Sequence, residues 1–202
     1  MEQTSFIGLV GLNRVGYLQA LCNKYGDIKV AKAWKDANTG ELVWTKHRSV
    51  LSCWESEEGL KFLETVNNRT GIDCEIRIDL DPKKISKKDC MGTVMLVDQT
   101  KQELDDWFNQ VCDKLEELGL KRYAGFHSGS RSYHISVIEP ELVARSAQNR
   151  KELKAYIIEK VGGDLIKVSD NTMMTLENCP NNKTGRIKEF VRGDSNWTRL
   201  DA

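Results

Sequence analysis

The chain has 202 residues, and its 30 basic side chains balance 30 acidic ones, so the formal net charge is zero. This length suits one domain with a substantial core. Since there is no excess positive charge, a nucleic-acid surface would have to come from local clustering of basic residues. No apolar run is long enough for a membrane helix, and the first residues, MEQTSF, do not form a signal peptide. Composition therefore predicts a cytoplasmic protein without a membrane partner.

The six cysteines are scattered along the chain, and no two of them form a CxxC pair. Structural zinc sites usually draw ligands from closely spaced cysteines. We therefore expect no zinc, and in a chain without a signal peptide we expect reduced thiols.

Hydrophobic spacing predicts alternating helices and strands. The first half should contain a helix that ends at Gly26, two strands joined by the turn-rich KDANTG, and then a helix, a strand and a polar connection; the ranges are 15–25, 28–34, 41–53, 56–67, 75–82 and 82–92. The second half should contain the clearest amphipathic helix, a strand pair, a helix that begins at Pro140, and two last strands; the ranges are 104–118, 121–127, 133–139, 140–161, 164–170 and 186–192.

The stretch EIRIDLDP places Asp79 and Asp81 on the same face of a strand, because side chains alternate between the two faces. Two carboxylates so close together repel each other. A divalent cation between them would relieve that repulsion, and Mg²⁺ binds carboxylate and phosphate oxygens together. Taken alone, the pair also fits a solvated strand end that Pro82 terminates.

A second stretch, GFHSGSRSYHISV, places a turn of Ser128, Gly129 and Ser130 before Arg131 and His134. Hydroxyls, backbone amides, a guanidinium and an imidazole together suit the binding of phosphate. An ordinary hairpin turn with a half-buried histidine fits the same residues.

A third stretch, residues 164–187, contains Asp170 after an apolar segment and the basic turn KTGR, which begins at Lys183. Asp170 could supply another carboxylate to a metal, and Lys183 a charge to a triphosphate. NKTG is also a common turn sequence.

In order, the segments IDLD, SGSRSYH, VSD and NKTGRI resemble the motifs of the archaeo-eukaryotic primase superfamily, over roughly residues 72–190. The resemblance implies that Asp79, Asp81 and Asp170 are catalytic and hold Mg²⁺ or Mn²⁺. It also implies nucleotide binding by Ser128, Gly129, Arg131, His134 and Lys183.

The resemblance further implies a DNA primase or primase-polymerase, a template-directed nucleotidyltransferase that uses two metals. Its partners would be nucleoside triphosphates, single-stranded or primer-template DNA, and accessory replication or repair subunits. The implied fold is α/β (α+β), with an N-terminal lobe over 1–70 and an RRM-like lobe over 71–202 that carries the motifs. The β-α-β-β-α-β order after residue 72 fits this fold independently.

The sequence departs from the family pattern at Ser130, Ser132, Thr175 and Asn181. Three alternatives therefore remain open: an end-joining repair polymerase, a metal-dependent nuclease, and a non-catalytic nucleic-acid-binding module with drifted motifs.

A template surface is less marked in the sequence. Trp44, Lys46 and Arg48 would share one face of a continuous strand, and aromatic and basic side chains together are typical of single-strand binders. A solvated edge strand with a packed tryptophan fits the same pattern.

Overall fold

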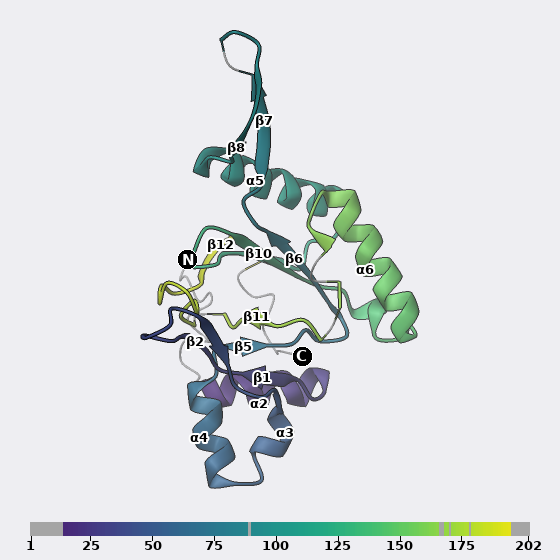
Figure 1. The fold of residues 1–202 in the computed structure, drawn as a ribbon. Helices are drawn as coiled ribbons and strands as arrows, with labels where there is room; N and C mark the ends of the chain where they lie inside the picture. The colour runs from purple at the N-terminus through teal and green to yellow at the C-terminus, as the bar shows by residue number, and fades with distance from the viewer. Residues whose placement is uncertain (1–13, 89, 166–167, 170, 178, 195–202) are drawn as a thin grey trace, which may run out of the picture.

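Residues 14–88, 90–165, 168–169, 171–177 and 179–194 are described by a computed structural model of the chain. They form a mixed α+β molecule with two four-stranded antiparallel sheets, one above the other in Figure 1. In these ranges no helix is both long and apolar enough to cross a membrane. The α+β class expected from the sequence is confirmed.

The first sheet consists of short strands and packs against three helices. Its order is β11-β5-β1-β4, so a strand from late in the chain joins strands from the first half of the chain. The strands are β1 (Lys29–Ala31), β4 (Arg48–Ser49), β5 (Asn68–Arg69) and β11 (Met174–Thr175). The helices are α2 (Arg14–Tyr25), α3 (Val50–Cys53) and α4 (Glu57–Thr65).

A separate hairpin stands beside this sheet. It consists of β2 (Ala33–Lys35) and β3 (Leu42–Trp44), joined by the predicted turn. The prediction of one strand over 41–53 is wrong, because the chain leaves strand geometry at 45–47 and forms β4 and then α3. Ser49 caps α3 by accepting a hydrogen bond from the Ser52 amide, which explains why a helix begins there.

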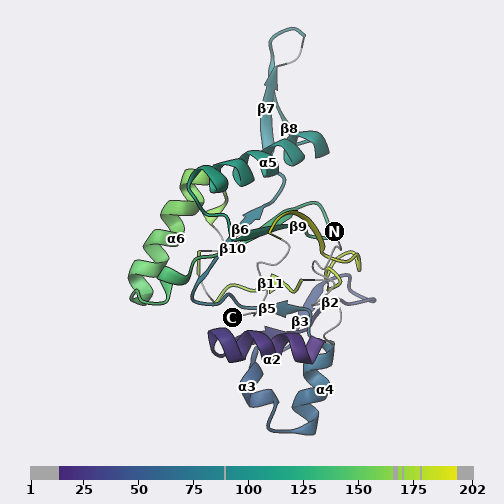
Figure 2. The same cartoon turned by 180° about the vertical axis from the view of Figure 1, so that it is seen from behind.

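The second sheet has longer strands, and the predicted strand pair is confirmed. Its order is β12-β9-β10-β6, from β6 (Glu75–Leu80), β9 (Tyr123–His127), β10 (Tyr133–Ile138) and β12 (Glu189–Gly193). Two helices, α5 (Lys101–Glu117) and α6 (Ala147–Val161), cover one face, as the view from behind shows (Figure 2). This is the RRM-like arrangement expected from the β-α-β-β-α-β order.

Two details of this lobe differ from the prediction. The helix expected over 140–161 is divided into a short 3₁₀ turn, η1 (Pro140–Leu142), and α6, because Ser146 caps a new helix. The strand expected over 164–170 appears, among the described residues, as a single antiparallel bridge between Asp164 and Asp79. That bridge places the segment after α6 along the outer edge of β6, while β12 lies on the opposite edge of the sheet.

The second sheet is buried on both faces, so the side chains on both faces of β6 are buried. Ile76, Ile78 and Leu80 pack with α5 and α6 in one apolar core. The alternate residues Glu75, Arg77 and Asp79 are also at most 6% exposed, but they face the other side. A second apolar core on that side joins Ala124 and Phe126 of β9 to α2 and the first sheet, so polar groups of β6 lie at the junction of the lobes.

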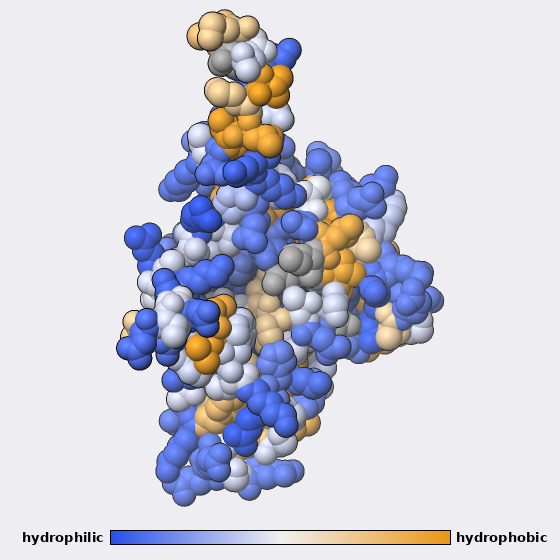
Figure 3. All heavy atoms as spheres, viewed as in Figure 1, coloured by the Kyte–Doolittle hydropathy of each residue, from blue (hydrophilic) through white to orange (hydrophobic). Residues whose placement is uncertain are grey.

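The stretch after Asp81, expected to be a polar connection, is a hairpin instead. It pairs β7 (Lys84–Lys88) with β8 (Val94–Asp98) and projects from the molecule beyond α5 (Figure 1). Met91, Val94 and Leu96 are 84%, 60% and 68% exposed, and apolar side chains are visible along the arm in Figure 3. Lys87 pairs with Glu103 at 2.6 Å, which holds the arm to the first turn of α5.

A buried cluster of charged groups joins the two lobes. The Arg69 guanidinium of β5 donates to both carboxylate oxygens of Glu75 on β6, at 2.7 and 2.8 Å, and to those of Glu177, at 3.2 and 3.3 Å. Glu177 also accepts from Lys188 Nζ at 3.2 Å and from the Tyr17 hydroxyl of α2 at 2.8 Å. Two anions therefore balance two cations, which satisfies the requirement for burying charge.

The cluster shifts the pKa values of its members. Burial alone would raise the pKa of Glu177, but the charges of Arg69 and Lys188 outweigh it and hold the pKa below its usual range. Glu75 behaves in the same way, since Arg69 lowers its pKa despite complete burial. Both glutamates are therefore ionised in the folded protein at neutral pH.

We expect Arg69→Met to lower the free energy of unfolding by about 3–5 kcal/mol, because it leaves two buried carboxylates without their main partner. Chemical denaturation of the purified variant measures this. Lys61→Met is the matched control: it breaks an exposed pair with Glu57 on α4 and should cost less than about 0.5 kcal/mol. Equal losses in the two variants would contradict a structural role for the cluster.

Acid should weaken the protein through the same carboxylates. Their stabilising contribution is complete above the unfolded-state pKa of about 4.3 and is lost as the pH falls toward the lower folded-state pKa. Glu177→Gln should therefore lower the thermal midpoint at pH 7 and reduce its further fall between pH 5 and pH 3. Calorimetry across this range tests the prediction, with the exposed Glu57→Gln as control. A variant with the wild-type pH dependence would contradict it.

Candidate active site between the two lobes

A cavity of about 450 Å³ opens between the two lobes, which in the structure are the first sheet with its helices and hairpin, β11 included, and the second sheet with its helices. The first sheet and the hairpin supply Leu42, Trp44, Asn68, Met174 and Thr175. The second sheet and the segments next to it supply Asp79, Asp81, Pro82, Ser130, Arg131, Ser132 and His134, and the remaining wall comes from Met173, Asn181, Asn182 and Lys183.

The acidic part of the wall lies at the end of β6. Asp79 is opposite His134 in the β6–β10 register, and its Oδ1 lies 3.6 Å from His134 Nε2. Both side chains are about nine-tenths buried. Asp81 lies one residue beyond the strand, is exposed, and lines the same cavity. The two carboxylates expected to act together therefore differ in environment.

The loop between β9 and β10 is organised by Ser128. Its hydroxyl accepts hydrogen bonds from the Ser130 and Ser132 amides at 3.3 Å and from the Ser132 hydroxyl at 2.8 Å. Ser128 is fully buried, so its side chain lies beneath the loop and outside the cavity wall. The loop presents Ser130 and the exposed Arg131 to the cavity.

The turn that carries Lys183 is docked against this loop. The Asn181 side chain donates to the Ser128 carbonyl at 2.9 Å, and the Thr184 hydroxyl donates to the Gly129 carbonyl at 2.6 Å. Gly129 has a φ of +76°, and a Cβ there would lie 2.4 Å from the Arg186 carbonyl oxygen. Only glycine fits this close approach without strain, so the two loops form one polar surface.

The structure thus brings together Asp79, Asp81, Arg131, His134, Lys183 and Trp44 around one cavity. Ser128 and Gly129 support the cavity from behind. Asp170 lies outside the described residues. Lys46 and Arg48 do not line the cavity, and Arg48 contacts the Phe62 ring at 5.0 Å and Glu58 at 3.8 Å.

Sequence reasoning missed several residues at the site. Asn68 and Asn182 line the cavity and exchange side-chain hydrogen bonds at 3.1 and 3.3 Å, although 114 positions separate them. Such a pair leaves no local signal in the sequence. Arg77, which is not part of the cavity wall, did leave a signal. It is a charged residue between apolar ones in a buried strand, on the same face as Asp79, and this pattern indicates a buried polar partner.

The donors in the cavity suit a hard divalent cation. Asp79 and Asp81 offer carboxylate oxygens, which Mg²⁺ and Mn²⁺ prefer. In the part of the chain that the structure describes, no three His, Cys, Asp or Glu side chains gather closely enough to hold a metal. A third carboxylate would have to come from outside that part, where Asp170 lies. All six cysteines are free.

Comparison with known proteins gives one significant sequence relative. The chain is 26% identical over 102 residues, half its length, to the DNA primase small subunit PriS of Pyrobaculum calidifontis. The match covers 32% of that subunit, so the chain spans about a third of the curated relative it matches. No family model matches the chain.

Solved structures with a similar fold include the AEP domain of the cyanophage S-2L primase-polymerase, with a TM-score of 0.48 and 15% identity over 91% of this chain and 90% of that one. The polymerase domain of Mycobacterium tuberculosis ligase D, solved with DNA, gives 0.48 and 11% over 93% and 81%. The catalytic domain of primase RepB′, solved with initiator DNA, gives 0.47 and 11% over 94% and 92%. The match to the primase small subunit confirms the resemblance to primase-polymerases that the motifs indicated.

Proposed function

We propose that this chain is a template-directed nucleotidyltransferase of the primase-polymerase type, which joins nucleotides on a single-stranded DNA template. The observation that carries the proposal is the one cavity in which Asp79 of β6 and Asp81 just beyond it lie with Arg131, His134 and Lys183. Carboxylates for divalent metals and cations for phosphates are the two requirements of this chemistry. The match to a primase small subunit supports the same assignment.

Each group would have a defined task. Two divalent ions bound by Asp79, Asp81 and Asp170 would activate the attacking 3′-hydroxyl and stabilise the leaving pyrophosphate. Arg131 and Lys183 would hold the triphosphate through charge-assisted hydrogen bonds. His134 lies against Asp79, and would contact a phosphate oxygen while keeping the carboxylate oriented.

The opposite wall would receive the base and the template. Trp44 and Leu42 are 41% and 37% exposed at the cavity, and an aromatic ring there can stack on a base. Lys46 and Arg48, on the segments that follow β3, would extend a basic path for the template backbone. The proposal also includes accessory replication or repair subunits as partners. Its substrates are nucleoside triphosphates, of the ribo or the deoxy type.

Removal of the two carboxylate charges should abolish catalysis. We expect Asp79→Asn/Asp81→Asn to lose primer extension with Mg²⁺ or Mn²⁺ while it still binds single-stranded template, because the fold keeps both side-chain shapes. The metal-dependent rise in thermal midpoint should also disappear. Extension of labelled primers and template binding by fluorescence anisotropy measure these effects.

The matched control is Asp98→Asn/Asp106→Asn, two exposed carboxylates outside the cavity wall, which should leave extension unchanged. Extension retained by the cavity variant would contradict the proposal. A wild-type chain that binds template but extends no primer would indicate a non-catalytic binding module, and one that degrades the template would indicate a nuclease.

Arg131 should carry much of the nucleotide binding. It is exposed at the cavity, and each charge-assisted contact it makes would contribute about 1.5–3 kcal/mol. Arg131→Ala should therefore raise the nucleotide KM about ten-fold or more with little change in thermal midpoint. Steady-state extension kinetics test this against Arg145→Ala, an exposed arginine in the loop before α6. An unchanged KM would exclude Arg131 from nucleotide binding.

A further inference from the structure

A buried arginine lies on the same strand face as Asp79. Arg77 occupies the middle of β6, two residues before Asp79, and is 2% exposed. A strand interior is an unfavourable place for a guanidinium unless its donors have specific acceptors. The acceptors that Arg77 contacts therefore indicate its role in the structure.

The guanidinium donates to two backbone carbonyls of one turn. Arg77 Nη2 lies 2.9 Å from the Ser169 carbonyl oxygen and Nη1 lies 2.5 Å from that of Thr172. The turn is closed by a hydrogen bond from the Thr172 amide to the Ser169 carbonyl at 3.1 Å. Ser169 and Thr172 are thus both attached to the strand that carries Asp79.

The surroundings make room for this contact. A Cβ at Gly71 would lie 2.8 Å from Arg77 Nε and 2.9 Å from Cζ, so a larger residue there would displace the guanidinium. Neighbouring Glu75 is engaged by Arg69, and the positive charge of Arg77 helps to lower its pKa, after the larger effect of Arg69. The site is therefore built around a guanidinium in one orientation.

We propose that Arg77 is a positioning residue, which holds Ser169 and Thr172, the described residues on either side of Asp170 in the sequence, to the strand that carries Asp79 and so aligns the carboxylates that share the metals. The inference rests on the proposed function, which makes Asp170, the residue after Ser169 in the sequence, a metal ligand. Arg77 itself is not among the residues that line the cavity. A planar guanidinium suits this task because its two parallel donors hold two carbonyls at once, whereas a lysine offers a single flexible ammonium.

The test uses Mn²⁺ alone as the first probe, with the full chain and no nucleotide. Arg77→Met should weaken Mn²⁺ binding, measured by calorimetry, at least ten-fold. It should also speed hydrogen exchange at least ten-fold in a peptide that covers 169–175, where the Thr172 amide is protected. Arg77→Lys should fall between Arg77→Met and the wild type in both measurements.

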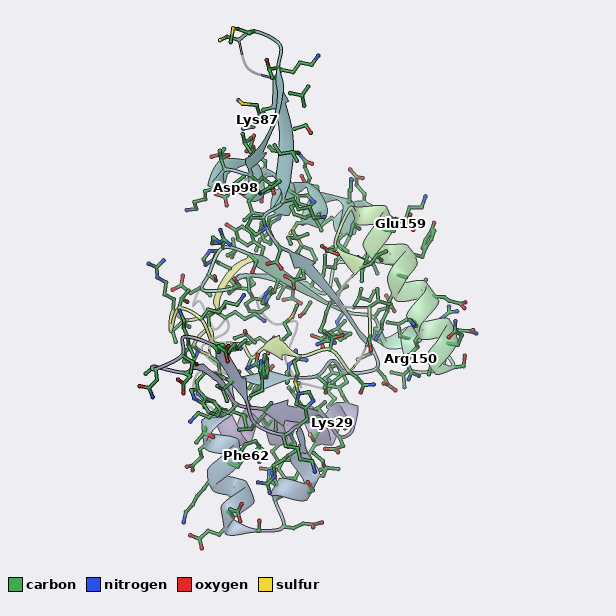
Figure 4. The ribbon with its side chains drawn as sticks, viewed as in Figure 1. Lys29, Phe62, Lys87, Asp98, Arg150 and Glu159 are labelled. Atoms are coloured by element: carbon green, nitrogen blue, oxygen red, sulfur yellow. The ribbon has the colours of Figure 1, made fainter. Side chains whose placement is uncertain are left out.

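The control is Arg150→Met. Arg150 lies on α6 (Figure 4). It pairs with Asp73 at 3.0 Å and donates to the Arg145 carbonyl, so the control also removes a guanidinium from a carbonyl. It should match the wild type in Mn²⁺ affinity and in exchange of 169–175. The proposal would be overturned if Arg77→Met bound Mn²⁺ as tightly as the wild type, or if hydrogen exchange in 169–175 were as slow as in the wild type. If Arg77→Met does not fold, the same measurements on Arg77→Lys decide it.

Kinetics separate positioning from a general loss of stability. In Arg77→Met the Mn²⁺ concentration for half-maximal extension should rise at least ten-fold, and the nucleotide KM at saturating Mn²⁺ should stay at its wild-type value. A raised KM with an unchanged metal requirement would overturn the positioning role. The two proposals can also fail separately. If the wild-type chain extends no primer, the proposed function is contradicted; weaker Mn²⁺ binding by Arg77→Met would then still support the positioning role.

Discussion

The molecule depends on the neutralisation of charge that is buried between its two sheets. Arg69 reaches both Glu75 and Glu177, and Lys188 completes the balance with a second contact to the Thr175 carbonyl at 2.9 Å. These residues come from four separate segments, so each segment is fixed by the others. Removal of one partner would leave an uncompensated charge in a site without water access, which costs more than the loss of an apolar contact. The cavity lies where this junction opens to solvent.

Strand β6 passes through that junction. Its side chains alternate between an apolar face and a polar face, so the same strand contributes to the core and to the cavity. Its apolar face packs against α5 and α6, while Glu75, Arg77 and Asp79 face the first lobe. Each of the three meets a different segment: Glu75 meets Arg69, Arg77 meets the turn 169–172, and Asp79 meets His134. One strand therefore fixes the relative positions of the lobes, the late turn and the acidic end of the cavity.

Residues that depart from the primase pattern make hydrogen bonds that stabilise the fold. Asn181 and the Ser132 hydroxyl both make hydrogen bonds to Ser128, and these bonds organise the two loops that support the cavity. Thr175 lies in β11 and its carbonyl accepts from Lys188. The departures give a cavity whose two loops are joined by neutral hydrogen bonds, while Arg131 and Lys183 supply exposed positive charge to its wall.

The sequence by itself determined the β-α-β-β-α-β order of the second sheet and its helices, the strand pair β9–β10, the amphipathic helix α5 and the acidic end of β6, because each of these follows from local periodicity or local residue chemistry. It did not determine the break after Trp44, where the Ser49 cap and packing of α3 replace a strand, or the arm after Pro82, where β7 and β8 satisfy each other's backbone groups. Only the tertiary structure decided which distant residues meet. Asn68 with Asn182, Arg69 with Glu177 and Arg77 with Ser169 lie 92 to 114 positions apart, and their contacts exist because the two sheets bury a polar surface that must be satisfied across the junction.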